Sequence, residues 1–401
     1  MKRIITYKFK KFNTIGYPEI NSAKKVLLSG KLSGFLAGTT DEFYGGIYVK
    51  KFEAKIKKYF KVNYAITVNS WTSGLIIALR SLNLKRGDEV ILPAWTMSAC
   101  FAAIQLNGLK SIFCDIDPDN YTLDINDLKK KISKKTKAIL AVDLFGMVCD
   151  YKNIFKLTQK RKIIIISDSA QAIGAKYNKN FSSTFVDIGG YSFNRHKHIN
   201  TGEGGVIITN NKKFATRCQL LRNHAESSTQ KKFFYQNEDK KLVGYNCRLG
   251  EIEAAVGIEQ LKKLKKIIIN RKKIAKKIYS SLDCLHGLII PKQEYLDSSV
   301  FYYMPFRIDN NLILTKKKDI IKMLTTLGLQ GLRESCSQLN RLSFFDGKKD
   351  KIQICKISEE MNRNSFFALA ICSFDFNERD IKLIVRCFFD VWKKIKFKNC
   401  E

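Results

Sequence analysis

Short apolar runs alternate along the first half of the chain with segments in which apolar residues recur every three or four positions. The short runs predict strands buried on both faces, and the spacing of three or four predicts helices with one buried face. Strands and helices that alternate in this way predict a mostly parallel sheet with helices on both faces. The predicted strands are 64–68, 89–92, 111–114, 138–142, 163–167 and 206–209, and the predicted helices are 19–28, 48–60, 75–82, 96–106, 126–132, 152–159 and 214–222.

The second half of the chain has a different pattern. A broad apolar stripe runs from Leu249 to Leu282 with no glycine or proline after Gly257, which predicts one long helix of the kind that joins two domains. We expect an N-terminal arm and helix in 1–30, a large domain in 31–255, and the linking helix with a small C-terminal α/β domain in 256–401. Within the last domain the predicted elements are a strand at 300–308 and helices at 317–327 and 378–396, and the predicted polar loops of the chain are 33–46 and 223–244.

The chain is strongly basic. It has 71 lysines and arginines against 37 aspartates and glutamates, which gives a formal net charge of +34. The lysines are spread over the whole chain, and many alternate with isoleucine at a helical period, which favours solvated helix faces. On charge alone two other interpretations stay open, an attraction of anionic substrates and a nucleic-acid surface. Among the 401 residues 45% are hydrophobic, so we expect a folded core rather than disorder.

Cysteine usage and the N-terminus bear on the compartment. The 11 cysteines include no CxxC pair, and only 4 histidines accompany them, so neither a metal site nor a disulfide framework is expected. Free thiols favour a reducing cytosol. The N-terminal segment MKRIITYKFKKFNTIGYPE has no apolar core of a signal peptide, and no run of about 18 apolar residues predicts a membrane span. We therefore expect a cytoplasmic protein.

Residues 69–74, Asn-Ser-Trp-Thr-Ser-Gly, follow a predicted strand and open a predicted helix. Free backbone N–H groups and hydroxyls at a helix N-terminus form a phosphate site. The same residues also suit a plain capped helix start, so this turn by itself leaves both possibilities open.

Asp168 follows the buried run 163–167 directly. An acid at the carboxyl end of a parallel strand points into the ligand crevice of such a sheet. A charged carboxylate in that position needs a cationic partner. The alternative is an aspartate that caps the next helix.

Lys197 lies between the predicted strand end Ser192-Phe193 and the glycine-rich turn 202–205, with Arg195 and two histidines beside it. Nearby cations lower the pKa of a lysine and favour Schiff-base chemistry. One lysine among so many is weak evidence by itself, and its basic neighbours equally suit an exposed surface.

Taken in order, three features resemble the DegT/StrS family of sugar aminotransferases. They are the hydroxyl-rich turn, the strand-end aspartate with Gln171 three residues on, and the lysine before a glycine-rich turn. The resemblance covers about residues 15–290 well, with further matches at 87–93 (GDEVILP), 115–118 (DIDP), 244–249 (GYNCRL) and 253–257 (EAAVG). It implies fold type I of the pyridoxal-phosphate (PLP) enzymes. In that fold a large domain, with a mostly parallel seven-stranded sheet and helices on both faces, carries a smaller C-terminal α/β domain.

The resemblance also implies a role for each matching residue. Lys197 is expected to hold the cofactor aldehyde and to shuttle a proton, and Asp168 is expected to pair with the pyridine nitrogen, so that the ring acts as an electron sink. The other expected cofactor contacts are Gln171 at the phenolic oxygen, Met97 in place of a stacking aromatic ring, Thr72, Ser73 and Ser192 at the phosphate, and Asn246 at the phosphate of the neighbouring subunit.

The chain departs from the family pattern in places. Trp71 stands where the phosphate turn of the family commonly has a glycine. Asn194-Arg195-His196 replaces a more apolar stretch before the lysine, and residues 371–377 replace a proline-rich ending.

The function implied by the resemblance is transfer of an amino group, from glutamate, to a keto group of a nucleotide-linked deoxysugar for surface polysaccharide such as O-antigen or capsule. The enzyme would be a homodimer with shared active sites, with no nucleic-acid partner and no membrane insertion. One alternative is a sugar dehydratase of the same fold that uses PLP or its amine form PMP, whose members often have histidine in place of the lysine. Another is a catalytically silent basic binding protein. The intact set of Asp168, Gln171, Ser192 and Lys197 favours transamination.

Overall fold

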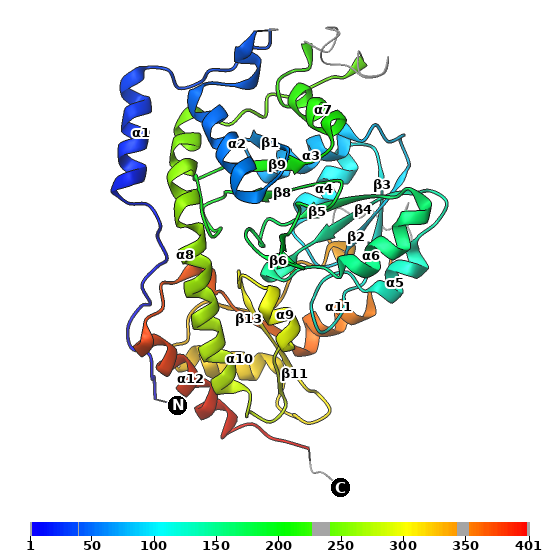
Figure 1. Ribbon diagram of the computed structural model, residues 1–401. Coiled ribbons are helices and arrows are strands. Elements are labelled where there is room, and N and C mark those ends of the chain that lie inside the picture. Colours follow the sequence, from blue (N-terminus) through cyan, green and yellow to red (C-terminus); the bar gives the residue numbers. More distant parts are fainter. Residues whose placement is uncertain (1, 39, 227–240, 343–352, 399–401) are drawn as a thin grey trace.

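A seven-stranded sheet forms the centre of the larger part of the computed structural model, which describes residues 2–38, 40–226, 241–342 and 353–398 (Figure 1). The strand order is β1-β9-β8-β5-β4-β2-β3. β9 runs antiparallel to both of its neighbours, and the other pairs are parallel. The strands are β1 (Tyr64–Val68), β2 (Glu89–Pro93), β3 (Lys110–Cys114), β4 (Thr136–Val142), β5 (Ile164–Asp168), β8 (Ile188–Ser192) and β9 (Gly205–Thr209).

Both faces of this sheet are covered, which explains why its strands are almost wholly apolar. Successive side chains of a strand point to opposite faces, so Val90 and Leu92 of β2 join one core cluster while Ile91 joins another. The first cluster is completed by α3, α4 and α7, and the second by α5 and α6. These helices are α3 (Trp71–Ser81), α4 (Ser98–Leu106), α5 (Ile125–Lys131), α6 (Tyr151–Thr158) and α7 (Lys212–Arg222).

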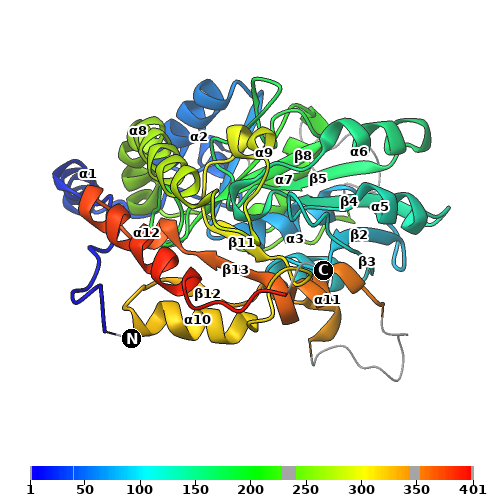
Figure 2. The ribbon, with the colours of Figure 1, turned by 90° about the horizontal axis from the view of Figure 1, so that it is seen from below.

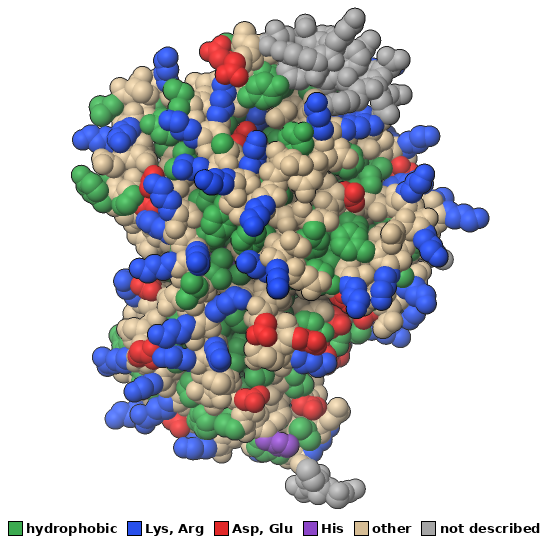
Figure 3. All heavy atoms as spheres, in the orientation of Figure 1, with side chains coloured by type: hydrophobic (Ala, Val, Ile, Leu, Met, Phe, Trp, Pro, Cys, Tyr) green, Lys and Arg blue, Asp and Glu red, His purple; other side chains and the backbone are tan. Residues whose placement is uncertain are grey.

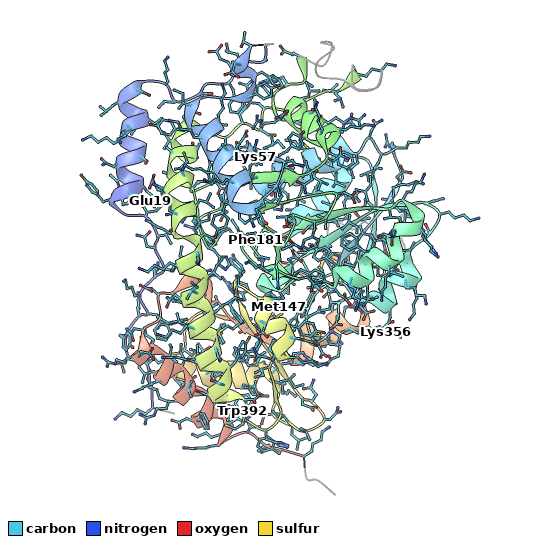
Figure 4. All side chains as sticks on the ribbon, viewed as in Figure 1. Glu19, Lys57, Met147, Phe181, Lys356 and Trp392 are labelled. Atoms are coloured by element: carbon cyan, nitrogen blue, oxygen red, sulfur yellow. The ribbon has the colours of Figure 1, made fainter. Side chains whose placement is uncertain are left out.

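The long helix α8 (Glu251–Leu282) runs from the large sheet to the small one, as the apolar stripe predicts (Figure 1). Its first half packs against α1 (Tyr17–Ser29) and α2 (Ile47–Phe60). Glu19, labelled on α1 in Figure 4, forms an ion pair with Lys263 of α8 at 2.6 Å. The second half of α8 contributes Ile274 and Ile278 to the core of the smaller part.

The smaller part is built on a four-stranded antiparallel sheet of order β10-β11-β13-β12. α10 and α12 pack against each other beside this sheet, as the view from below shows (Figure 2). The N-terminal arm joins the same core through Ile5 and Phe9. The elements are β10 (Leu288–Ile289), α9 (Gln293–Ser298), β11 (Met304–Ile308), α10 (Lys317–Thr326), β12 (Leu332–Arg333), α11 (Lys356–Glu360), β13 (Phe366–Leu369) and α12 (Glu378–Trp392), and a separate hairpin pairs β6 (Lys176–Tyr177) with β7 (Asn180–Phe181).

Three predicted elements are wrong by four residues at one end, and one of them, the helix expected over 378–396, ends at Trp392 of α12. The helix expected from Leu75 begins at Trp71, because the Ser70 hydroxyl accepts a hydrogen bond from the Ser73 N–H and caps the first turn. The strand expected over 300–308 is limited to β11, because Val300 and Tyr302 donate their N–H groups to the carbonyls of Gly146 and Phe145 instead. Residues 227–240 of the expected polar stretch lie outside the described residues. The expected domain limits stay predictions.

Lysine and arginine side chains are spread over the whole visible face rather than gathered in one patch (Figure 3). None of the helices in the described part of the chain combines the length and the apolar character needed to cross a bilayer. The cysteines that the structure describes are all free thiols.

Candidate active site

A cavity of about 580 Å³ lies at the carboxyl ends of β4, β5 and β8. Ligands of open α/β sheets bind at this edge, and the volume is in the usual range for small-molecule sites. The large sheet supplies the floor through the strand ends and the start of α3. The smaller part of the chain supplies a second wall that includes Tyr302, Arg333 and Phe366.

Asp168 is the last residue of β5 and is 5% exposed. Its Oδ1 accepts hydrogen bonds from Trp71 Nε1 at 2.7 Å and from the Ala170 N–H at 3.0 Å. Its Oδ2 accepts one from Cys100 Sγ at 3.1 Å. A buried carboxylate costs free energy unless donors and cations compensate it, and here three donors hold it at the edge of the cavity.

Lys197 lies in the tight connection between β8 and β9. The chain reverses there through hydrogen bonds from the Phe193 N–H to the Gly204 carbonyl and from the Lys197 N–H to the Asn194 carbonyl, both 2.9 Å. Gly204 has φ +150°, and a Cβ atom at that position would lie 2.6 Å from the Thr201 hydroxyl. The turn therefore needs glycine at 204, and it presents Lys197 to the cavity.

The surroundings of Lys197 favour its neutral amine. Burial lowers the pKa of Lys197, and the negative charge of Asp168 opposes that change in part. Its Nζ lies 4.6 Å from the centre of the Tyr302 ring. Because the neutral amine is the nucleophile, a lowered pKa suits attack on a carbonyl carbon.

The two histidines beside Lys197 have different roles. His198 is fully buried, and its Nε2 lies 2.9 Å from the Val300 carbonyl, so it ties the lysine loop to the segment before β11. Burial holds the pKa of His198 well below its usual value. His196 lines the cavity, and its pKa is lowered by burial and by the neighbouring cations Arg195 and Lys197.

The first turn of α3 faces the same cavity through Ser70, Trp71 and Thr72. The Ser73 N–H donates to Ser70 Oγ at 3.1 Å, whereas the N–H groups of Trp71 and Thr72 have no acceptor among the described residues. Unpaired N–H groups at a helix N-terminus bind anions. The hydroxyl residue Ser192, at the end of β8, lines the cavity as well.

The structure brings six of the predicted site residues to one cavity, namely Thr72, Met97, Asp168, Gln171, Ser192 and Lys197. Ser73 does not line it, and its hydroxyl lies 2.9 Å from that of Ser70, which does. Asn246 is exposed and pairs with Asn223 across a β-bridge. The roles of all these residues, including the contact of Asn246 with a neighbouring subunit, stay predictions.

Several residues of the site were not found by sequence reasoning. Cys100 lies in α4 and carries no motif, and Tyr302 and Arg333 come from the smaller part of the chain. Asp143, directly after β4, is fully buried next to the cavity and accepts a hydrogen bond of 2.5 Å from the Ser169 hydroxyl. Burial raises the pKa of Asp143 to about 6. Cys100, Tyr302 and Arg333 have no local sequence signal, because each depends on contacts between distant segments. Asp143 follows the predicted strand 138–142 directly, and the signal that singled out Asp168 could have found it.

The fold and the site define an α/β protein with a ligand cavity between a large and a small sheet, where a lysine and a strand-end aspartate meet. More particularly, the chain belongs to the DegT/DnrJ/EryC1/StrS aminotransferase family, whose sequence model matches residues 37–386.

Individual relatives agree with this assignment. The chain is 37% identical over 244 residues to GDP-perosamine synthase of Escherichia coli O157:H7, a match over 60% of this chain and 65% of that protein, or less than two thirds of its length. Among solved structures, a GDP-4-keto-6-deoxymannose-3-dehydratase with trapped PLP and glutamate superposes with a TM-score of 0.82 at 25% identity, over 96% of this chain and 100% of the other. PseC of Helicobacter pylori, an aminotransferase involved in pseudoaminic acid biosynthesis, has a TM-score of 0.83 at 22% identity, over 97% and 99%, which shows a shared fold.

Proposed function

We propose that this protein is a PLP-dependent aminotransferase that moves an amino group from glutamate to a keto group of a nucleotide-linked deoxysugar. The observation that carries the proposal is the meeting of Lys197 and Asp168 in one cavity, beside the open N-terminus of α3. Membership of an aminotransferase family supports the reaction type.

The residues present fit the cofactor. The Asp168 carboxylate suits a protonated pyridine nitrogen, and the Lys197 amine suits the aldehyde carbon. The unpaired N–H groups of α3 and the Ser192 hydroxyl suit the phosphate. Met97, which is 65% exposed at the cavity, offers a thioether to a ring face. When bound, PLP supplies an electron sink for negative charge that develops on the amino acid.

Side chains of this protein would then have separate roles in the reaction. Lys197 Nζ would take a proton from Cα of the donor and deliver it to the carbon that was the aldehyde of the cofactor, and its lowered pKa favours the neutral amine that this role needs. Asp168, fixed by its three donors, would keep the pyridine nitrogen of bound PLP protonated. The rings of Tyr302 and Phe366 line the cavity and keep water from these groups.

The sugar substrate we propose is linked to a nucleoside diphosphate. Arg333 and His196 both line the cavity, and the Arg333 guanidinium places positive charge where a diphosphate would enter. Relatives named for GDP-linked sugars make GDP-4-keto-6-deoxymannose the first compound to test. We further propose a cytoplasmic homodimer that supplies surface polysaccharide synthesis and in which Asn246 completes the site of the partner subunit.

The absorption spectrum of the purified protein with added PLP tests the proposal. We expect a band near about 420 nm in the wild type that glutamate removes. In Lys197→Ala the band should be absent, because the amine that reacts with the aldehyde is lost. A wild-type protein that binds no PLP, or a bound band that glutamate leaves unchanged, would contradict the proposal.

Product analysis separates this reaction from the dehydratase alternative, which the similarity to the GDP-4-keto-6-deoxymannose-3-dehydratase favours. With glutamate and GDP-4-keto-6-deoxymannose we expect a product that gains nitrogen. A product that loses the C3 hydroxyl without nitrogen gain would identify a dehydratase instead.

A further inference from the structure

Trp71 occupies a slot that three glycines leave open. It is the first residue of α3 and is 5% exposed. A Cβ atom on Gly190 would lie 2.2 Å from Trp71 Cζ3, and one on Gly74 would lie 2.6 Å from Trp71 Cε3. A Cβ atom on Gly205 would lie 2.7 Å from the backbone nitrogen of Trp71. The indole therefore has one well-defined place between α3 and the sheet.

In that place the indole N–H reaches the carboxylate of Asp168. The distance from Trp71 Nε1 to Oδ1 is 2.7 Å, a good length for a hydrogen bond to a charged acceptor. A glycine at position 71 would supply no such donor.

Cys100 supplies a second donor from the opposite side. Its Sγ lies 3.1 Å from Asp168 Oδ2 and 3.4 Å from the Thr96 hydroxyl. The thiol is fully buried, and burial raises the pKa of Cys100 well above its usual value, so it keeps its proton. A protonated thiol next to a carboxylate donates the hydrogen bond.

The acceptor positions of the carboxylate can now be counted. An ionised carboxylate offers about four, two on each oxygen. Trp71 and the Ala170 N–H take both positions of Oδ1, and Cys100 takes one position of Oδ2. One position, on Oδ2, has no donor within the part of the chain that the structure describes.

We propose that Trp71 and Cys100 are positioning residues that fix the rotation of the Asp168 carboxylate and leave one Oδ2 acceptor for the protonated pyridine nitrogen of the cofactor. This inference rests on the proposed function. It assigns Trp71 the task of orienting a catalytic group, in addition to filling the slot.

Trp71→Phe tests the inference, because phenylalanine keeps an aromatic ring in the slot and removes the donor. Trp392→Phe is the matched control. The indole of Trp392 donates to the His286 carbonyl at 2.9 Å, is 6% exposed, and lies in α12 of the smaller part (Figure 4). Both variants lose one buried indole hydrogen bond, so we expect similar small decreases in the Tm of the cofactor-free protein.

The affinity for PLP, measured by equilibrium dialysis, should then separate the two variants. We expect Trp71→Phe to bind PLP about tenfold more weakly, as for the loss of one hydrogen bond to a charged group, and Trp392→Phe to bind it as the wild type does. The pH at which the bound-cofactor absorbance changes should also move in Trp71→Phe alone. If Trp71→Phe keeps the wild-type affinity and pH profile, the inference is wrong. If the wild type itself binds no PLP, the proposed function fails first.

A second pair of variants keeps the test open if Trp71→Phe does not fold. Cys100→Ser retains a hydrogen-bond donor at the same Cβ, and Cys100→Ala removes it. We expect Cys100→Ala to bind PLP severalfold more weakly than Cys100→Ser, by the same dialysis measurement. Equal affinities in these two variants would overturn the role of Cys100 as a donor to Asp168.

Discussion

Burial shifts the pKa values of individual residues around the cavity. It lowers the pKa of Lys197 and raises that of Asp143, since a charge of either sign loses hydration there. The two residues differ in what they then do. Both line the cavity, but the carboxylate of Asp143 is held in a network with the hydroxyls of Ser169 and Tyr151.

Asp143 makes the stability of the protein depend on pH. Its folded pKa is raised from 3.8 to about 6, so between these values the unfolded chain loses the proton while the folded protein keeps it. The contribution of Asp143 to the free energy of unfolding therefore falls as the pH rises through this range, by about 3 kcal/mol at 1.36 kcal/mol per pKa unit. Above pH 6 it changes no further.

Asp143→Asn should remove this decrease. The free energies of unfolding of wild type and variant can be measured by urea denaturation between pH 4 and pH 7. As the pH rises, we expect the wild type to lose stability relative to the variant. A difference that stays constant over this range would contradict the raised pKa.

At the scale of elements, helix starts and strand ends build the site. α3 follows β1 and begins at the cavity, so that the cap of the helix and its anion-binding end are the same few residues. Ser70 accepts from the Ser73 N–H and leaves the first two N–H groups of the helix open. The capped start of α3 therefore belongs to the site because β1, which precedes it, ends at the cavity.

Ser70→Ala should lower the free energy of unfolding by about 1 kcal/mol, the usual value of an N-cap. Asn377→Ala, which removes the cap of α12, is the control with a similar effect on stability. Pyridoxal lacks the phosphate of PLP, so the ratio of the two affinities measures how much the phosphate contributes to binding. We expect this ratio to fall in Ser70→Ala and to stay unchanged in Asn377→Ala. A similar ratio in both variants would place the phosphate elsewhere.

At the scale of the whole molecule, the cavity exists because two sheets meet. α8 packs with the large part at one end and with the core of the small part at the other, and His198 is tied to Val300 between them. The small part adds Tyr302 and Arg333 to a floor made by the large sheet. The proposed dimer would add Asn246 from the partner subunit.

Mixed dimers test that sharing. Lys197→Ala and Asn246→Ala should each be nearly inactive alone. After unfolding and refolding together, half of the dimers are mixed, and one of the two sites in each then carries neither substitution. We expect recovery of about a quarter of wild-type aminotransferase activity. No recovery, with mixed dimers demonstrated by native mass spectrometry, would place Asn246 in its own subunit's site, and an active Asn246→Ala protein would place it outside both sites.

The apolar patterns by themselves determined the alternation of strands and helices and the length of α8, because these depend on which face of a local element is buried. With the motif order they also determined the family and the fold class, which the family match and the structure confirm. The start of α3 at Trp71 depends on the cap by Ser70, a local signal that the apolar pattern alone does not contain. The loss of strand structure at 300–303 was beyond local patterns, since the distant carbonyls of Gly146 and Phe145 decided it.

Only the tertiary structure decided what surrounds Asp168. Trp71 is 97 residues from Asp168 in the chain, and Cys100 is 68 residues away. From the sequence, Trp71 was a departure from a glycine and Cys100 one thiol among 11. A hydrogen bond depends on distance and direction in space, and the sheet order that brings these segments together is a property of the folded chain as a whole.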